Sequence, residues 1–163
     1  MKSNIKVIPF LLVLVINFLV GTLFWTLFVK AGKRIFEYEF WTYKPLILIL
    51  IIFLEVFALN LLFKLKTIIV EKDKVIFKNL IFPFLKKERL FSYYDFSKIV
   101  DEYSRSGFHE SLWLFKNGKL ENQISSFYYS NYTKLKFEIK VQHKGKLKIN
   151  SFKQIYYKLG GKL

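Results

Sequence analysis

The chain has 163 residues, a net charge of +15 and no cysteine, and 53% of its residues are hydrophobic. A chain without cysteine can form no disulfide and carry out no thiolate chemistry. Only three of its 27 basic residues are arginine, the residue that best grips phosphate and guanine, which argues against nucleic-acid binding. Its apolar residues are concentrated near one end, unlike those of an ordinary soluble domain of this length.

Two long apolar runs, Val7–Val29 and Pro45–Phe63, predict a pair of membrane-spanning helices. A helix rises ~1.5 Å per residue, so either run can cross a hydrocarbon core ~30 Å thick. The first run is longer than the apolar core of a signal peptide and lacks a small-residue cleavage site, so we expect it to be retained. Because only the loop 30–44 separates the two runs, they should form a hairpin with both chain ends on one side.

The distribution of lysine and arginine near the helix ends predicts the orientation of this hairpin. The side that holds both termini has seven of these residues and the connecting loop has four, which favours cytoplasmic termini and an outer loop. Aromatic residues prefer the headgroup layer of a bilayer. Those expected to act as interfacial anchors on the outer side are Trp25, Tyr38, Trp41 and Tyr43.

Two polar residues, Asn17 and Glu55, lie near the middle of their respective runs. An ionised carboxylate at mid-membrane costs ~3 kcal/mol or more, so Glu55 should be protonated or turned toward a polar partner such as Asn17. Three interpretations remain open for this intramembrane polar pair. They are an interhelical hydrogen bond worth ~1 kcal/mol or less, a contact with a helix of a partner protein, and a proton- or ion-handling site.

The pattern changes after residue 66 to short strand-like runs separated by turns. Lys72-Asp73-Lys74 indicates a tight hairpin, and Asn117-Gly118 between two such runs is a strong hairpin signal. The apolar run Leu112–Phe115 predicts a strand buried on both faces. The other expected strands are Thr67–Glu71, Val75–Lys78, Lys87–Phe91, Lys98–Tyr103 and Lys119–Ile124, and Pro83 makes Leu80–Leu85 an edge or a bend. Strands at this spacing suggest a small antiparallel sheet closed toward a barrel.

Helical segments are expected near the C-terminus. Ser151 and Gln154 fit a capping box, and Gly160 can end the helix that follows it. One face of this helix would carry Phe152, Ile155, Tyr156 and Leu159. The segment Tyr132–Val141 alternates like a strand but follows residues that can cap a helix, and we favour the helix. The predicted fold is therefore α+β, with a transmembrane hairpin at 1–66 and a cytoplasmic β domain with C-terminal helices at 67–163.

The two spans are followed by strands at Ile68–Glu71 and Val75–Phe77, then by the segments Leu112–Lys119 and Tyr129–Leu135. This order resembles the small bacterial membrane proteins with a pleckstrin-homology-like domain. The resemblance implies a seven-stranded, bent β-barrel capped by a helix, a binding role, and a place in the bacterial inner membrane. The segment Lys144–Leu163 is an addition to the family pattern.

No recognisable motif in the sequence supplies catalytic or metal-binding chemistry. The two histidines, His109 and His143, are far apart and have no metal-ligand spacing. The segment Ser104–Gly107 does not form the elbow of a serine hydrolase, and the adjacent Asp101 and Glu102 would point to opposite faces of a strand. We therefore expect no enzymatic activity, no cofactor and no metal.

The best candidate for a functional surface is electrostatic. Residues 64–163 contain 21 Lys or Arg and nine Asp or Glu, and this charge would be tethered beside an anionic leaflet. In pleckstrin-homology-like folds, the first hairpin and its neighbouring loop form a basic mouth that can meet lipid headgroups. The resemblance assigns that role to Lys72, Lys74, Lys78, Lys86, Lys87 and Arg89. The alternative is a solvated, lysine-rich surface that only helps to orient the domain.

These observations predict a non-catalytic integral membrane protein whose cytoplasmic domain binds a partner protein or anionic lipid headgroups. Two alternatives remain open. The chain can be an immunity-type protein that blocks a membrane-acting toxin, or an accessory subunit of a larger membrane transport or secretion complex. No nucleic-acid partner is expected.

Overall fold

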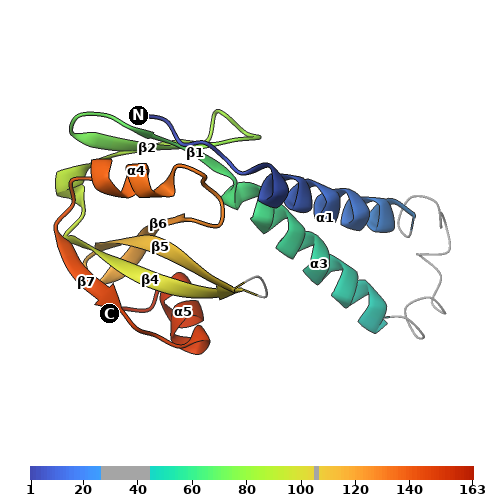
Figure 1. The fold of residues 1–163 in the computed structure, drawn as a ribbon. Helices are drawn as coiled ribbons and strands as arrows, with labels where there is room; N and C mark the ends of the chain where they lie inside the picture. The colour runs from blue at the N-terminus through green and yellow to red at the C-terminus, as the bar shows by residue number, and fades with distance from the viewer. Residues whose placement is uncertain (27–44, 105–106) are drawn as a thin grey trace. The chain divides into compact units, whose positions relative to one another are not determined.

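The structure, a computed structural model, describes residues 1–26, 45–104 and 107–163, and over these residues the chain is α+β (Figure 1). It divides into two compact units. The helical unit is Val7–Leu65, and the sheet unit is Met1–Lys6 together with Lys66–Leu163. We expected the first six residues to belong with the hairpin, but they fold with the strands.

The helical unit contains α1 (Val7–Trp25) and α3 (Pro45–Lys64), which pack against each other. Among the described residues, α1 is the one helix whose length and composition would allow it to cross a membrane. Large apolar side chains on both helices are exposed, for example Phe18 at 70% and Phe53 at 66%. Of the predicted interfacial anchors, Trp25 ends α1 and is exposed. Tyr38, Trp41 and Tyr43 lie outside the described residues.

Two sheets form the framework of the sheet unit. The three-stranded sheet is antiparallel with the order β1-β2-β3, in which the strands are β1 (Lys66–Val70), β2 (Lys74–Asn79) and β3 (Lys86–Leu90). The four-stranded sheet has the order β6-β5-β4-β7 and consists of β4 (Phe96–Ser104), β5 (Gly107–Lys116), β6 (Lys119–Ser125) and β7 (His143–Leu147). Because β7 runs parallel to β4, this sheet is mixed and not purely antiparallel as predicted.

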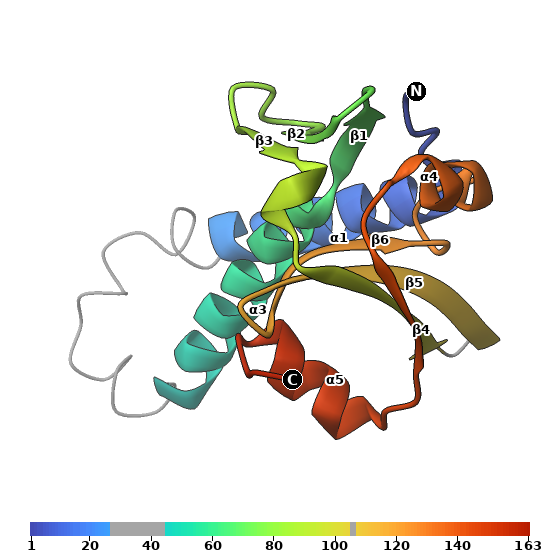
Figure 2. The same ribbon diagram turned by 90° about the vertical axis from the view of Figure 1, so that its left-hand side faces the viewer.

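Three short helices complete the sheet unit: η3 (Phe91–Tyr93), α4 (Tyr132–Glu138) and α5 (Ser151–Lys158). The main core joins residues of both sheets to α4, and Ile68, Leu114 and Leu135 are fully buried in it. A second, smaller core lies on the other face of the four-stranded sheet, where Trp113 packs against Tyr157 of α5. Figure 2 shows α5 on that face. The prediction that β5 is buried on both faces is confirmed.

The predicted turn between β5 and β6 is confirmed, whereas the predicted N-cap of α5 is wrong. Asn117 (φ 51°) and Gly118 (φ 72°) form the expected turn between β5 and β6, since a type I′ turn needs a positive φ at both positions. Gly160 (φ 96°) follows α5, as predicted. The prediction of a capping box at Ser151 is wrong. Asn150 caps α5 by accepting the Lys153 N–H at 2.9 Å, because the Gln154 side chain donates instead to the Asp101 carbonyl.

Met1–Lys6 form a clamp on the edge of β1, and we call this segment the N-terminal clamp. The Ser3 N–H donates to the Ile68 carbonyl at 2.7 Å, and the Val70 N–H donates to the Met1 carbonyl at 2.7 Å. The Ile68 N–H in turn donates to Ser3 Oγ at 2.8 Å, in a contact where the serine is 5% exposed. The clamp therefore occupies backbone groups that an edge strand would otherwise leave open.

The other side of the clamp binds the segment that leads into α4. The Lys6 N–H donates to the Tyr128 carbonyl at 2.8 Å, and the Ser130 N–H donates to the Asn4 carbonyl at 2.9 Å. Asn131 adds a bond from its Nδ2 to the Lys2 carbonyl at 2.9 Å. The first six residues thus join β1 to a segment more than 50 residues further along the chain.

We expect Ser3→Ala to destabilise the sheet unit by about 1–3 kcal/mol, because it leaves the buried N–H of Ile68 without its acceptor. The measurement is guanidinium unfolding of the detergent-solubilised chain, together with faster hydrogen exchange of β1 peptides. Ser130→Ala is the matched control, since the Ser130 hydroxyl is exposed and makes a longer bond of 3.3 Å to Asn4. Equal effects of the two substitutions would contradict the role of the clamp.

Candidate functional site

The strand register places five of the six predicted basic residues, all except Lys72, on two faces of the three-stranded sheet. Lys78 lies directly opposite Lys86 on the outer face. Lys87 lies opposite Phe77, and Arg89 opposite Val75, so both are on the face that carries the main core. Because side chains alternate between faces along a strand, these cations cannot form one continuous basic surface.

The same residues also divide between the two ends of this sheet. Lys72 lies in the β1–β2 turn, whereas Lys78 and Lys86 lie where Lys66 pairs with Asn79. A strand of five residues separates its two ends by about 13 Å. The structure therefore does not bring all six predicted residues together into a single mouth.

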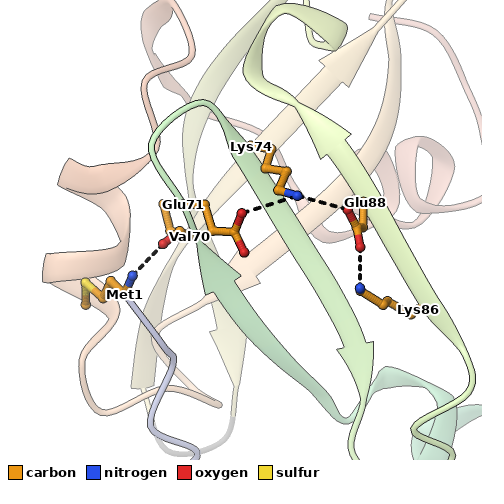
Figure 3. Close-up of polar contacts among 6 residues, drawn as sticks. All are labelled: Met1, Val70, Glu71, Lys74, Lys86 and Glu88. Atoms are coloured by element: carbon orange, nitrogen blue, oxygen red, sulfur yellow. Dashed lines mark hydrogen bonds and ion pairs between the residues drawn. The ribbon is translucent and has the colours of Figure 1, made fainter.

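An ion-pair ladder neutralises part of the outer face (Figure 3). Lys74 Nζ lies 3.2 Å from carboxylate oxygens of both Glu71 and Glu88, and Lys86 pairs with the other oxygen of Glu88. Hydrogen bonds to Lys86 and Lys74 lower the pKa of Glu88, and bonds to Glu88 and Glu71 raise the pKa of Lys74. These lysines are thus held by neighbouring carboxylates.

On the inner face, two of the predicted cations, Lys87 and Arg89, contact acidic and aromatic groups. Lys87 pairs with Glu121 of β6. The guanidinium of Arg89 lies 4.7 Å from the centre of the Tyr93 ring, and its Nη1 donates to the Glu88 carbonyl at 3.1 Å. These contacts connect β3 to the rest of the sheet unit.

Lys66 joins the positive groups at the end of the sheet where β1 begins. Burial, and secondarily the charge of Lys87, lower the pKa of Lys66 below its ordinary value. An anion at this end of the sheet would relieve that repulsion.

Lys72 lines a surface hollow of about 460 Å³ at the opposite end of the sheet. The hollow is lined by Met1, Val70, Glu71, Lys72, Glu138 and Lys140. Its cationic groups are accompanied by two carboxylates, and the N-terminal amine donates to the Val70 carbonyl (Figure 3). The hollow is therefore a mixed polar surface and not a strong anion trap.

Two exposed apolar surfaces belong to the sheet unit and were not singled out from the sequence as sites. The β2–β3 loop, residues 80–85, exposes Phe84 to 79%. The helix α5 exposes Phe152 to 82% and Leu159 to 83%, while its Gln154 faces the sheet and is buried. The sequence signals were an uninterrupted apolar run bordered by lysines and an amphipathic helix, both of which suggest burial within the fold.

The predicted intramembrane polar pair, Asn17 and Glu55, is not joined by any hydrogen bond that the described residues show. Asn17 Nδ2 donates to the Val13 carbonyl of its own helix at 2.8 Å. Glu55 Oε2 is buried and has no hydrogen-bond partner in the described part of the chain. An interaction between Asn17 and Glu55, or between Glu55 and a foreign helix, therefore stays a prediction.

Among the described residues of the sheet unit, the polar contacts do not assemble into a recognisable catalytic centre. Ser97 Oγ lies 3.4 Å from His143 Nδ1, but this serine is 3% exposed and its hydroxyl also lies 3.4 Å from the Gln142 carbonyl. Across residues 1–26, 45–104 and 107–163, no group of three His, Asp or Glu side chains is placed to hold a metal ion.

No protein family, no curated protein and no solved structure matches this chain. A function must therefore be argued from the arrangement of its own residues.

Glu88→Gln should increase the rate at which acetic anhydride modifies Lys74. Loss of the carboxylate lowers the raised pKa of Lys74 toward its ordinary value, so a larger fraction of the amine is neutral and reactive. The gain should be partial, because Glu71 still pairs with Lys74. Mass spectrometry of the modified chain measures it. Glu138→Gln removes the same charge outside the ladder, and an equal gain there would contradict a local effect.

Proposed function

We propose that this chain is a non-enzymatic membrane protein, anchored by two helices, whose sheet unit binds anionic lipid headgroups at the membrane surface beside it. The observation that carries the proposal is the N-terminal clamp. Met1 and Ser3 bind β1, and Lys6, which binds the Tyr128 carbonyl, directly precedes α1. α3 ends at Lys64, next to the first residue of β1. Each helix is therefore connected directly to a hydrogen-bonded segment of the sheet unit.

The clamp supports retention of the first helix. Cleavage of α1 as a leader would also remove the six residues that bind Ile68, Val70 and Tyr128. Backbone groups of a strand that lose their partners without regaining water cost free energy. A chain that keeps its first helix keeps these bonds.

The lengths of α1 and α3 and the apolar sequence of the second run support two membrane crossings, one more than the described residues show. At ~1.5 Å per residue, the 19 residues of α1 and the 20 residues of α3 each extend close to the ~30 Å of a hydrocarbon core. Between Pro45 and Phe63, the only charged residue is Glu55. With the lysine bias of the sequence, two crossings would put both termini and the sheet unit in the cytoplasm, and the resemblance implies a bacterial inner membrane.

We also propose that the sheet unit is a pleckstrin-homology-like barrel. Seven strands in two sheets that share one core support it. Two features depart from the plain pattern, because α4 precedes the last strand and β7 is parallel to β4. The assignment implies binding, and the lysine excess of the sheet unit makes an anionic surface the favoured ligand.

Cysteine labelling tests the proposed topology, because the chain contains no cysteine of its own. In bacterial cells that express single variants, a membrane-impermeant maleimide should label Gly32→Cys in intact cells and Thr133→Cys only after permeabilisation. The protein should also stay in the membrane pellet after alkaline extraction. Labelling of Thr133→Cys in intact cells, or release by alkali, would contradict the proposal.

A second candidate function is the capture of a partner protein by α5. Its outward face carries Phe152, Ile155, Tyr156 and Leu159, all more than half exposed. Residues 139–163 contain seven lysines and no acidic residue. An apolar stripe flanked by cations fits a hydrophobic groove with an acidic rim, as in helix-in-groove recognition.

A photocrosslinking residue at Ile155 tests this second function. We expect it to join one defined partner in cells, and the double substitution Phe152→Glu and Leu159→Glu to abolish the adduct. Phe137 of α4, which is 77% exposed, is the matched control position. The same adducts from both positions would indicate non-specific contact and count against a partner site on α5.

A further inference from the structure

The β2–β3 loop is a built apolar knob. Residues 80–85 read Leu-Ile-Phe-Pro-Phe-Leu, six apolar residues in succession. Asn79, which is 4% exposed, holds the loop in shape, since its Oδ1 accepts the N–H groups of Ile81 at 2.9 Å and Phe82 at 2.8 Å. The Leu85 N–H donates to the Phe82 carbonyl at 2.9 Å. Internal hydrogen bonds thus satisfy these backbone groups while the loop exposes apolar side chains.

The exposed part of the knob is apolar. Phe84 is 79% exposed and Leu85 is 43% exposed, and the rings of Phe82 and Phe84 lie 6.0 Å apart. A proline in the turn limits the conformations of the loop. Exposed apolar surface of this kind marks a contact with a protein or a membrane.

Positive charge surrounds the base of the knob. Lys78 and Lys86 are directly opposite each other on β2 and β3, an arrangement that is unfavourable for like charges. Glu88 pairs with Lys86, but no ion pair in the described part of the chain includes Lys78. Lys66 lies at the same end of the sheet, whereas Lys87 pairs with Glu121 on the inner face. This end of the sheet therefore has cations beyond those that its carboxylates neutralise.

Connectivity gives the direction in which the knob points along its sheet. Lys66 pairs with Asn79, so the knob lies at the end of the sheet where β1 begins. β1 begins directly after α3, which ends at Lys64. Figure 1 draws the knob as the yellow-green loop between β2 and β3.

We propose that residues 80–85 insert into the cytoplasmic leaflet, with Phe84 and Leu85 among the upper acyl chains and Lys78 and Lys86 on anionic headgroups. This inference rests on the proposed function, because it requires α3 to end at the membrane surface. Apolar burial and attraction to anionic lipid act together in such interfacial contacts. The loop would fix the sheet unit against the bilayer instead of leaving it mobile on two tethers.

The experiment uses the full chain in vesicles of phosphatidylcholine and phosphatidylglycerol. Single-cysteine variants carry an environment-sensitive fluorophore, and lipids with a doxyl group near the headgroup act as quenchers. Phe84→Cys should show a blue-shifted emission that shallow doxyl lipid quenches several-fold. Asp73→Cys, in the turn at the other end of the same sheet, is the matched control and should be quenched by aqueous iodide instead.

A second fluorophore, at Phe18→Cys of α1, should be quenched by lipid with a deeper doxyl group. It distinguishes a failure of loop insertion from a failure of the membrane anchor. If Phe18→Cys is quenched and Phe84→Cys behaves like Asp73→Cys, the insertion of the loop is wrong while the membrane anchor stands. If Phe18→Cys is not quenched, the proposed function itself fails. Protection of Phe84→Cys from iodide without quenching by lipid would show that a protein, such as a second copy of the chain, covers the knob.

A separate experiment tests whether insertion of the loop requires the positive charges of Lys78 and Lys86. The double substitution Lys78→Gln and Lys86→Gln should reduce quenching at position 84 several-fold in the mixed vesicles. Vesicles of phosphatidylcholine alone should give that weaker signal with or without the substitutions. Lys134→Gln and Lys153→Gln remove the same charge elsewhere in the sheet unit and serve as the control. Equal losses from both pairs would overturn a specific role for Lys78 and Lys86.

Discussion

The pairing of Met1–Lys6 with β1 is the interaction on which the rest of the structure depends. It occupies the free edge of the three-stranded sheet through Ile68 and Val70, and it links that sheet to the segment before α4. α4 contributes the fully buried Leu135 to the main core. The same six residues lead directly into α1, so one backbone segment connects the core of the sheet unit to the helical unit.

The lysines of the sheet unit differ in their surroundings: some are paired with carboxylates, and others face a second lysine. Lys74 and Lys86 are held by Glu71 and Glu88 on the outer face, where such exposed pairs stabilise the fold only weakly. At the end where β1 begins, the like charges of Lys78 and Lys86 face each other. Net charge alone is therefore a poor guide to the binding surface. The excess of cations over nearby carboxylates at one end of a strand pair is more informative.

The elements with strong local signals were predictable from the sequence. The apolar run from Leu112 to Phe115 marks β5, and Asn117-Gly118 marks the turn after it, because few residues tolerate the positive φ that this turn requires. The N-terminal clamp gave no such signal, since its partners are more than 60 residues away. β7 was missed because most of its side chains are exposed and polar, so its pairing with β4 depends on the backbone.

The sequence predicts that the candidate site is cationic, but it does not predict how the residues of the site are arranged. Lysine content identified a cationic module, yet only the register shows that Lys87 and Arg89 lie on the core side of the sheet. The apolar residues at 80–85 looked like an edge or a bend, and the exposure of Phe84 depends on the Asn79 bonds that hold the loop. The cap of α5 was misplaced by one residue, because Asn150 and Ser151 are both competent caps and tertiary contacts of Gln154 decide between them.

The N-terminal clamp also has a consequence for biosynthesis. On the proposed topology, a chain that had threaded only one helix would hold Met1–Lys6 and β1 in different compartments. The edge of β1 would then stay open, and an open edge invites association with other chains. On that topology, membrane insertion and sheet closure would be consecutive steps of one assembly, and the sheet unit would reach its full complement of backbone bonds only after the second crossing.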